Sequence, residues 1–89
     1  MVEERLQKLL RKALNAQDLM VEDDTKAFTV PGWDSLKHVE ILLAVQKEYQ
    51  VHFRSTEVIR LKNVGDLQEL IKRKSQEKAD VIIDVNFSN

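Results

Sequence analysis

Ser35 and His38 are the two residues whose types and spacing come closest to a reactive pair. They stand three positions apart within a helical pattern, so their side chains share one helix face. A serine beside a histidine is the beginning of a hydrolytic site. Such a site also needs a group that orients the histidine and backbone donors for an oxyanion. The sequence offers neither, so we disfavour a hydrolase and predict no catalytic residue.

A metal site and a nucleic-acid site are also disfavoured. Asp34 and His38 share a face, but His52 is the only other imidazole and there is no cysteine, so no metal ligand set is predicted. The basic residues after position 53 are interleaved with acids, and the helix that begins at Ser35 is mostly apolar. Basic stripes typical of nucleic-acid binding are therefore missing from the sequence pattern.

The setting of Ser35 is the feature that sets it apart. It follows the turn formers Pro31 and Gly32, and it comes directly after Asp34, which we expect to cap the N-terminus of a helix. A hydroxyl in the first turn projects toward solvent beside positive backbone potential, which suits an attached phosphate. The simpler alternative is that Ser35 is an ordinary first-turn serine.

Helical spacing of apolar residues predicts the elements that must position this turn. Two glycines and one proline in the chain indicate helices with few breaks. The expected fold class is all-α, a bundle with three principal helices, one short helix and a long first loop. The predicted helices cover residues 2–15, 35 to 49 or 50, about 56–60, and 63 to about 74.

The connection over residues 16–33 is long for a compact domain. We expect Leu19, Met20, Phe28 and Val30 to pin it to the core as an ordered loop. Residues 76–89 are of another kind, because 81–87 are rich in strand-forming types. We predict a bundle over 1–75 and a C-terminal tail over 76–89, which is a mobile tail, a segment that folds back, or a docking strand.

Composition narrows the class of protein. The chain has 89 residues, 43 % of them hydrophobic and 33 % charged, with a net charge of −1. Without cysteine it has no disulfide, zinc finger, iron–sulfur cluster or thiol of its own. The longest apolar run, 41–45, is far below the roughly 18 residues of a membrane span. We expect a cytoplasmic monomer without nucleic-acid or membrane partners.

The residues around Ser35 form the most informative motif, Gly32-Trp33-Asp34-Ser35-Leu36. It resembles the attachment motif of acyl carrier proteins, whose hallmark is Asp-Ser-Leu at the start of the second helix. The similarity extends over residues 2–74. It includes matching residue types at Val39, Glu40, Ala44, Tyr49 and Asn63-Val64-Gly65-Asp66-Leu67.

This resemblance implies a non-catalytic carrier whose cofactor is 4′-phosphopantetheine. Ser35 would be esterified by a phosphopantetheinyl transferase that uses coenzyme A. The arm would hold an acyl or aminoacyl intermediate as a thioester for a loading enzyme and for downstream synthase or transferase enzymes. The residues expected to recognise partners are Asp34, Leu36, Lys37, Glu40 and Leu43. Those expected to line a core that loosens around cargo are Ile41, Val45, Val58, Ile59 and Leu67.

The charge of the second helix departs from the family pattern, which is rich in acid. Lys37, His38, Gln46 and Lys47 accompany Glu40 and Glu48 in this helix. Fatty-acid enzymes that read a carrier through basic patches should therefore bind it less well. We predict a specialised carrier of a secondary pathway, of polyketide or non-ribosomal assembly, or of short acyl or aminoacyl cargo. The alternative is a helical protein–protein interaction module without a prosthetic group.

Overall fold

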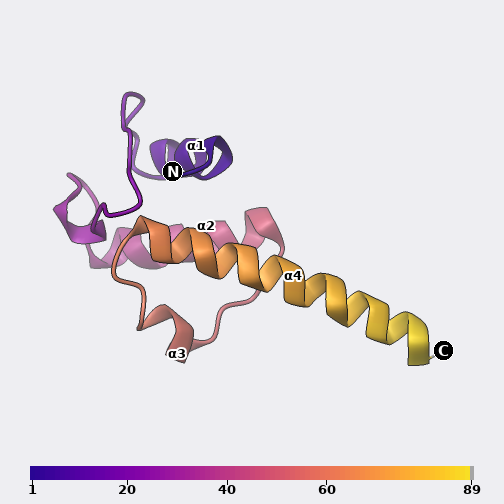
Figure 1. Cartoon of the computed structure of the whole chain (residues 1–89). Coiled ribbons are helices and arrows are strands. Elements are labelled where there is room, and N and C mark those ends of the chain that lie inside the picture. Colours follow the sequence, from indigo (N-terminus) through magenta and orange to yellow (C-terminus); the bar gives the residue numbers. More distant parts are fainter. Residues whose placement is uncertain (89) are drawn as a thin grey trace.

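The computed structural model describes the backbone of residues 1–88 and the side chains of residues 1–77. Every regular element in that range is helical, which confirms the predicted all-α class (Figure 1). The elements are α1 (Glu4–Ala13), the 3-10 helix η1 (Ala27–Thr29), α2 (Ser35–Tyr49), α3 (Ser55–Val58) and α4 (Val64–Ser88).

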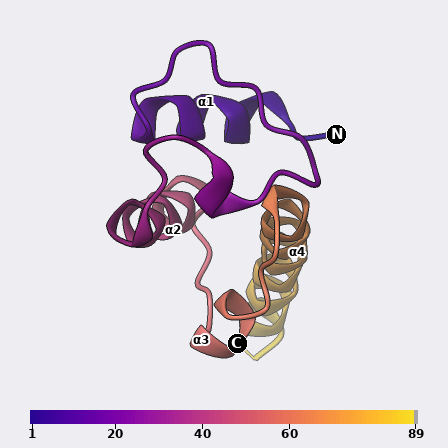
Figure 2. The same cartoon turned by 90° about the vertical axis from the view of Figure 1, so that its left-hand side faces the viewer.

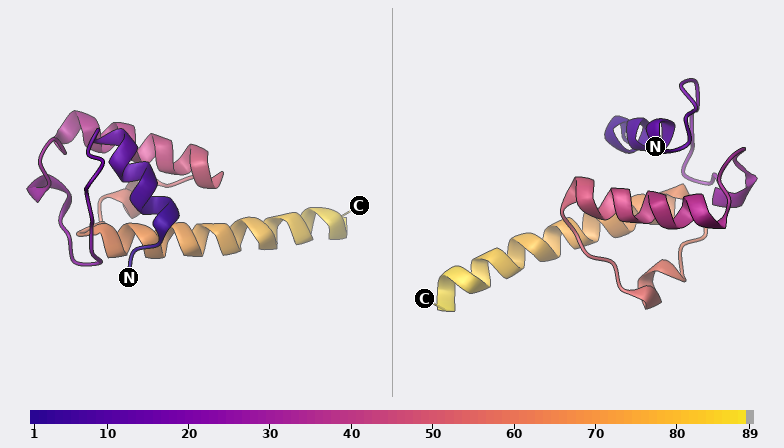
Figure 3. Two further views of the ribbon diagram at one scale, coloured as in Figure 1. Left: turned by 90° about the horizontal axis from the view of Figure 1, so that it is seen from above. Right: turned by 180° about the vertical axis from the view of Figure 1, so that it is seen from behind.

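The long helices α2 and α4 run side by side, and α1 lies across one side of both. Figure 2, which looks nearly along α2 and α4, shows α1 on one side and the short α3 on the other. Figure 3 shows the same crossing of α1 over α2 and α4 from above. The first loop descends from the end of α1 to the start of α2, so it brings the motif around Ser35 to one end of the molecule.

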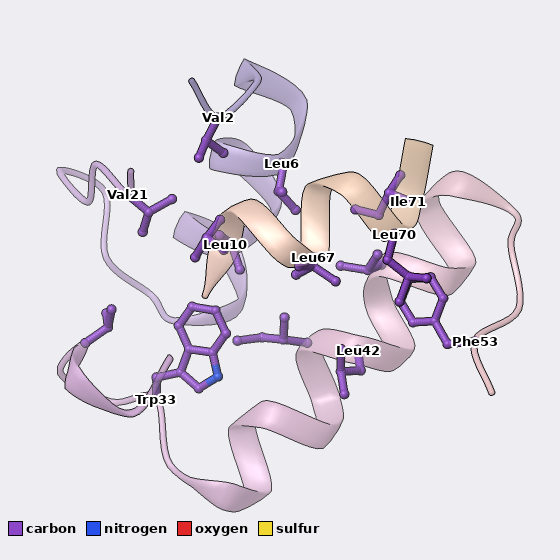
Figure 4. Close-up of a cluster of buried hydrophobic side chains, with 14 residues drawn as sticks. Val2, Leu6, Leu10, Val21, Trp33, Leu42, Phe53, Leu67, Leu70 and Ile71 are labelled. Atoms are coloured by element: carbon purple, nitrogen blue, oxygen red, sulfur yellow. The ribbon is translucent and has the colours of Figure 1, made fainter. Parts of the chain in front are cut away.

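The core forms where the apolar faces of the helices meet. Figure 4 shows 14 buried side chains that converge from α1, α2, α4 and the first loop. Helical spacing accounts for most of them, and burial of each large aliphatic side chain contributes about 1.5–3 kcal/mol to folding. The buried helical residues are Leu6, Leu10, Ile41, Leu42, Val45, Val64, Leu67, Leu70 and Ile71.

The first loop is ordered by contacts that differ in part from the predicted ones. Val30 is buried as expected, but Met20 and Phe28 are exposed, and Val21 and Trp33 are buried in their place. The buried side chain of Gln7 on α1 explains the position of Val21. Its amide donates to the Val21 carbonyl at 2.8 Å and accepts from the Val21 N–H at 3.0 Å.

A close backbone contact joins the same loop to the start of α4. The Gly65 N–H donates to the Asp23 carbonyl at 2.7 Å, and the Val64 N–H donates to the Thr25 carbonyl at 2.8 Å. A Cβ on Gly65 would lie 2.7 Å from the Asp23 carbonyl oxygen, so only glycine allows this approach. The first loop is thereby fixed between α1 and α4.

Two polar contacts attach α3 to α4. The Lys74 ammonium lies 2.8 Å from the Glu57 carboxylate, and the Arg73 guanidinium lies 3.5 Å from it. The hydrogen bond from Lys74 lowers the pKa of Glu57. These contacts hold a four-residue helix that could not be stable alone.

The last helix is longer than predicted. We expected it to end near residue 74 and residues 76–89 to form a tail that is mobile, folds back or docks as a strand, but α4 continues to Ser88. No proline or glycine follows Gly65, and residues 76–79 are good helix formers. The strand-forming residues that follow have no neighbouring strand in the described chain, so the helix continues through them. The division into residues 1–75 and 76–89 stays a prediction.

Candidate functional site

The turn before α2 fixes the position of Ser35. Gly32 has φ of +83°, a conformation that favours glycine, and Trp33 after it is buried. Asp34 is extended and caps the helix, because its carboxylate accepts from the Lys37 N–H at 2.8 Å. Ser35 is the first residue of α2, as predicted, and its side chain is exposed. The serine therefore stands at a rigid, solvent-facing corner.

This corner fits a phosphodiester. The first N–H groups of a helix lack partners within the helix, and the dipole makes that end electropositive. The first turn of α2 contains no acidic residue, so this potential is offset by the capping Asp34 alone. A phosphate joined to the Ser35 hydroxyl would project into solvent, and the neighbouring Asp34 carboxylate is engaged by the Lys37 N–H.

An exposed apolar row runs along α2 from this corner. Leu36 is 72 % exposed, Val39 54 % and Leu43 62 %. Their spacing places them on one helix face. Apolar residues cover more than half of the circumference of this helix, so the sequence pattern left open whether Val39 belonged to the core or to an interface. The structure leaves all three side chains in solvent, which is typical of an interaction surface.

The other predicted recognition residues border this row. Glu40 is exposed and forms an ion pair with Lys37 at 2.9 Å, one helical turn earlier. Lys37 is half-buried, whereas Asp34 is exposed beside Ser35. The structure thus brings the five predicted recognition residues together on the solvent side of α2. Whether they bind a partner remains a prediction.

A pocket of about 270 Å³ lies behind the Ser35 corner. It is formed by η1, the start of α2 and the segment that leads into α4. Its apolar walls include Phe28, Trp33, Leu42, Leu61 and Leu67. Ligand pockets commonly enclose about 300–1,000 Å³, so this pocket suits only a small group.

The predicted cavity residues are only partly consistent with this geometry. Of the five, Leu67 lines the pocket, and Ile41 and Val45 are fully buried nearby in the core. Val58 is half-buried, but Ile59 is 84 % exposed, so its assignment to the core was wrong. The short α3 ends at Val58, and Ile59 therefore turns outward.

His38 has a role that the sequence did not suggest. The Trp33 indole N–H donates to His38 Nδ1 at 3.1 Å, and the Phe28 ring lies 5.2 Å from the imidazole. Because an indole can only donate, His38 is neutral and carries its proton on Nε2. Burial lowers the pKa of His38. With Nδ1 held by Trp33, His38 helps to build the pocket wall, and a Ser35–His38 catalytic pair is further disfavoured.

We predict that the burial of His38 makes stability depend on pH below about 6.5, the ordinary pKa of histidine. The folded state keeps His38 neutral to lower pH than the unfolded state does. Unfolded chains therefore bind more protons in that window, and stability falls as pH falls.

The measurement is urea unfolding followed by the fluorescence of Trp33, the only tryptophan, at pH 7.5 and 5.5. Between pH 7.5 and 5.5 the urea midpoint of His38→Gln should decrease less than that of wild type. The midpoint of His52→Gln, a change at an exposed site, should decrease as much as that of wild type. An equal decrease in wild type and His38→Gln would contradict the assignment.

Two further features of the described chain bear on function. Among the described residues, no three histidine, aspartate or glutamate side chains are grouped so that they could hold a metal ion. None of the helices in the described part combines the length and apolar character that crossing a membrane requires.

Comparison with known proteins agrees with the geometry. The family model described as "Phosphopantetheine attachment site" matches residues 4–71. Acyl carrier proteins from two strains of Buchnera aphidicola subsp. Acyrthosiphon pisum, Tuc7 and APS, are each 25 % identical over 77 residues, which is 86 % of this chain and 96 % of theirs. The solution structure of holo acyl carrier protein from Geobacter metallireducens superposes with a TM-score of 0.81 and 28 % identity, over 86 % of this chain and 88 % of that one.

The matched span contains α1, α2, α3 and the first part of α4, with the Asp34-Ser35-Leu36 motif near its middle. The match in sequence and the match in fold thus agree on the same region. The chain belongs to the acyl carrier protein family, as a non-catalytic carrier with a covalently attached 4′-phosphopantetheine group.

Proposed function

We propose that Ser35 is the attachment residue and that the chain carries acyl or aminoacyl cargo in a specialised pathway. The observation that carries this proposal is the exposed Ser35 hydroxyl at the first turn of α2, within the Asp34-Ser35-Leu36 motif and inside the span matched to the family. The protein needs no general base of its own, because a phosphopantetheinyl transferase supplies the activation.

The chemistry at Ser35 is a single substitution at phosphorus. A bond forms between the Ser35 oxygen and the β-phosphorus of coenzyme A, the bond from that phosphorus to adenosine 3′,5′-bisphosphate breaks, and the serine proton passes to the transferase. The capped turn holds the hydroxyl outward, and Asp34 keeps the helix start in place. Once bound, the group supplies a thiol that holds cargo as a thioester.

The exposed row of Leu36, Val39 and Leu43 is suited to brief docking of enzymes beside the attachment point. Small apolar anchors surrounded by charge favour transient rather than permanent contacts. A cytoplasmic location, a monomeric state and the identity of the loading and downstream enzymes belong to the same proposal.

The absence of cysteine gives a simple test of cargo carriage. The chain as translated should show no titratable thiol. After treatment with a broad-specificity transferase, coenzyme A and magnesium, it should show one thiol per chain. Acylation should remove that thiol and neutral hydroxylamine should restore it. A folded chain that gains no thiol would instead favour the interaction module.

We predict that the charge of α2 restricts which enzymes bind the carrier. Lys37→Asp with Lys47→Glu should strengthen binding to fatty-acid enzymes with basic docking patches by about 3- to 10-fold, since exposed charge pairs contribute roughly 0.2–1 kcal/mol each. Titration of the modified carrier against such an enzyme measures the change. Arg60→Glu with Lys72→Glu alters net charge equally at other exposed positions. An equal gain in both variants, or none in either, would contradict a specialised surface.

A further inference from the structure

A second surface feature lies between α1 and α2, away from Ser35. It is a groove of about 760 Å³ lined by residues of both helices. Figure 3 shows how α1 crosses α2 in this region. Leu9, Ala13 and Ala44 provide apolar surface in the groove. All three are half-buried, and the two alanines leave room for close approach of another backbone. The groove is therefore shaped to receive an apolar ridge.

Basic residues surround this apolar surface. Arg5, Lys8 and Lys12 come from α1, and Lys47 comes from α2; Glu48 of α2 is the acidic residue of the lining. On α1, the spacing of three and four residues places these side chains on the same face as Leu9. The protein as a whole is nearly neutral, with a net charge of −1, so this concentration of positive charge is local.

Most of this charge is not neutralised within the protein. Arg5 pairs with Glu48 at 3.0 Å and lies 4.4 Å from the centre of the Tyr49 ring. Lys8, Lys12 and Lys47 are exposed, and among the side chains of residues 1–77 none of them forms an ion pair. Lys8 and Lys12 also repel one another, because like charges four residues apart on a helix are unfavourable. A carboxylate from outside would relieve this repulsion.

We propose that the α1–α2 groove binds an acidic amphipathic helix of a partner protein. The apolar face of that helix would pack on Leu9, Ala13 and Ala44, and its carboxylates would face Lys8, Lys12 and Lys47. An apolar groove between two helices favours a third helix as its ligand. A nucleic-acid backbone would instead need a continuous basic stripe.

The groove is continuous with the exposed row on α2. Lys47 follows Leu43 by four residues, so the two side chains lie on the same face of the helix. A partner that docks beside Ser35 could therefore extend an acidic helix into the groove. The groove does not include Ser35, and its binding does not require modification of Ser35.

The test uses the full chain labelled with ¹⁵N and a synthetic helical peptide with leucine on one face and glutamate on the flanks. Amide shifts should concentrate at Leu9, Ala13 and Ala44, with a dissociation constant in the micromolar range that weakens about 10-fold in high salt. Lys8→Glu, Lys12→Glu and Lys47→Glu combined should weaken binding at least 10-fold. Glutamine at the same three positions should weaken it less while leaving the helices intact.

The matched control reverses three exposed charges elsewhere, Lys26→Glu, Arg60→Glu and Lys72→Glu. At high salt, the dissociation constant of this variant for the peptide should be within twofold of the wild-type value. Equal weakening in both triple variants would overturn the proposal, as would shifts outside the groove. Stronger binding of an RNA oligonucleotide at the same lysines would overturn the choice of a protein partner. The chain with Ser35→Ala should bind the peptide unchanged, which separates this result from any failure of the attachment proposal.

Discussion

Trp33→Ala should destabilise the domain by about 3–5 kcal/mol, a large share of the 5–15 kcal/mol typical of a folded domain. Trp33 is 4 % exposed, packs in the core and donates to His38 at 3.1 Å. Its loss leaves a cavity beside the turn that carries Ser35, and it removes one partner of a half-buried hydrogen bond. Equilibrium unfolding followed by circular dichroism measures the change, because the variant has no tryptophan fluorescence.

Two controls separate packing from hydrogen bonding. Trp33→Phe retains most of the ring volume and removes the indole donor, so it should cost about 1–2 kcal/mol. Phe28→Ala, at a residue that is 63 % exposed and also contacts the His38 ring, should cost less than Trp33→Ala. A loss below 1 kcal/mol for Trp33→Ala would mean that the turn does not depend on this anchor.

Leu36→Glu should lower kcat/KM for phosphopantetheine transfer about 30-fold without changing stability. The side chain is 72 % exposed and lies next to Ser35, so the folded chain loses little when it is replaced. A central apolar anchor of an interface commonly contributes 2 kcal/mol or more, which corresponds to the expected factor. Steady-state kinetics of phosphopantetheine transfer from coenzyme A measures the change in kcat/KM.

Ile59→Glu is the matched control for this change. Ile59 is also aliphatic and is 84 % exposed, but it follows α3 and is not part of α2. Its replacement should leave transfer within twofold of wild type. If the two variants lose activity equally, charge alone is responsible and Leu36 is not an anchor.

The helices were predictable where local chemistry fixes them. The Asp34 cap and the apolar spacing after it gave the bounds of α2, and acids and bases at the two ends of α1 marked that helix within about two residues. The end of α4 was missed because the basic residues 72–74 were taken to end the helix and the strand-forming residues at 81–87 were taken as part of a tail, although no glycine or proline stops the helix.

The features that the sequence did not predict depend on tertiary contacts. Val39 belongs to a helix with apolar residues on more than half of its circumference, so the pattern alone could not tell which part is covered. The Trp33–His38 hydrogen bond joins a turn to a helix, and no local rule predicts it. Similarly, Lys8 and Lys47 each look like solvated surface residues until the packing of α1 on α2 places them in one groove.

The central claim is that Ser35 accepts the phosphopantetheine group, and intact mass spectrometry tests it most directly. The chain is incubated with a broad-specificity transferase, coenzyme A and magnesium, and the modified peptide is then located by fragmentation. Ser55→Ala is the matched control, because Ser55 is also an exposed first residue of a helix. We expect one addition, located at Ser35, present in Ser55→Ala and absent in Ser35→Ala. An addition that persists in Ser35→Ala, or that is located at another residue, would contradict the claim.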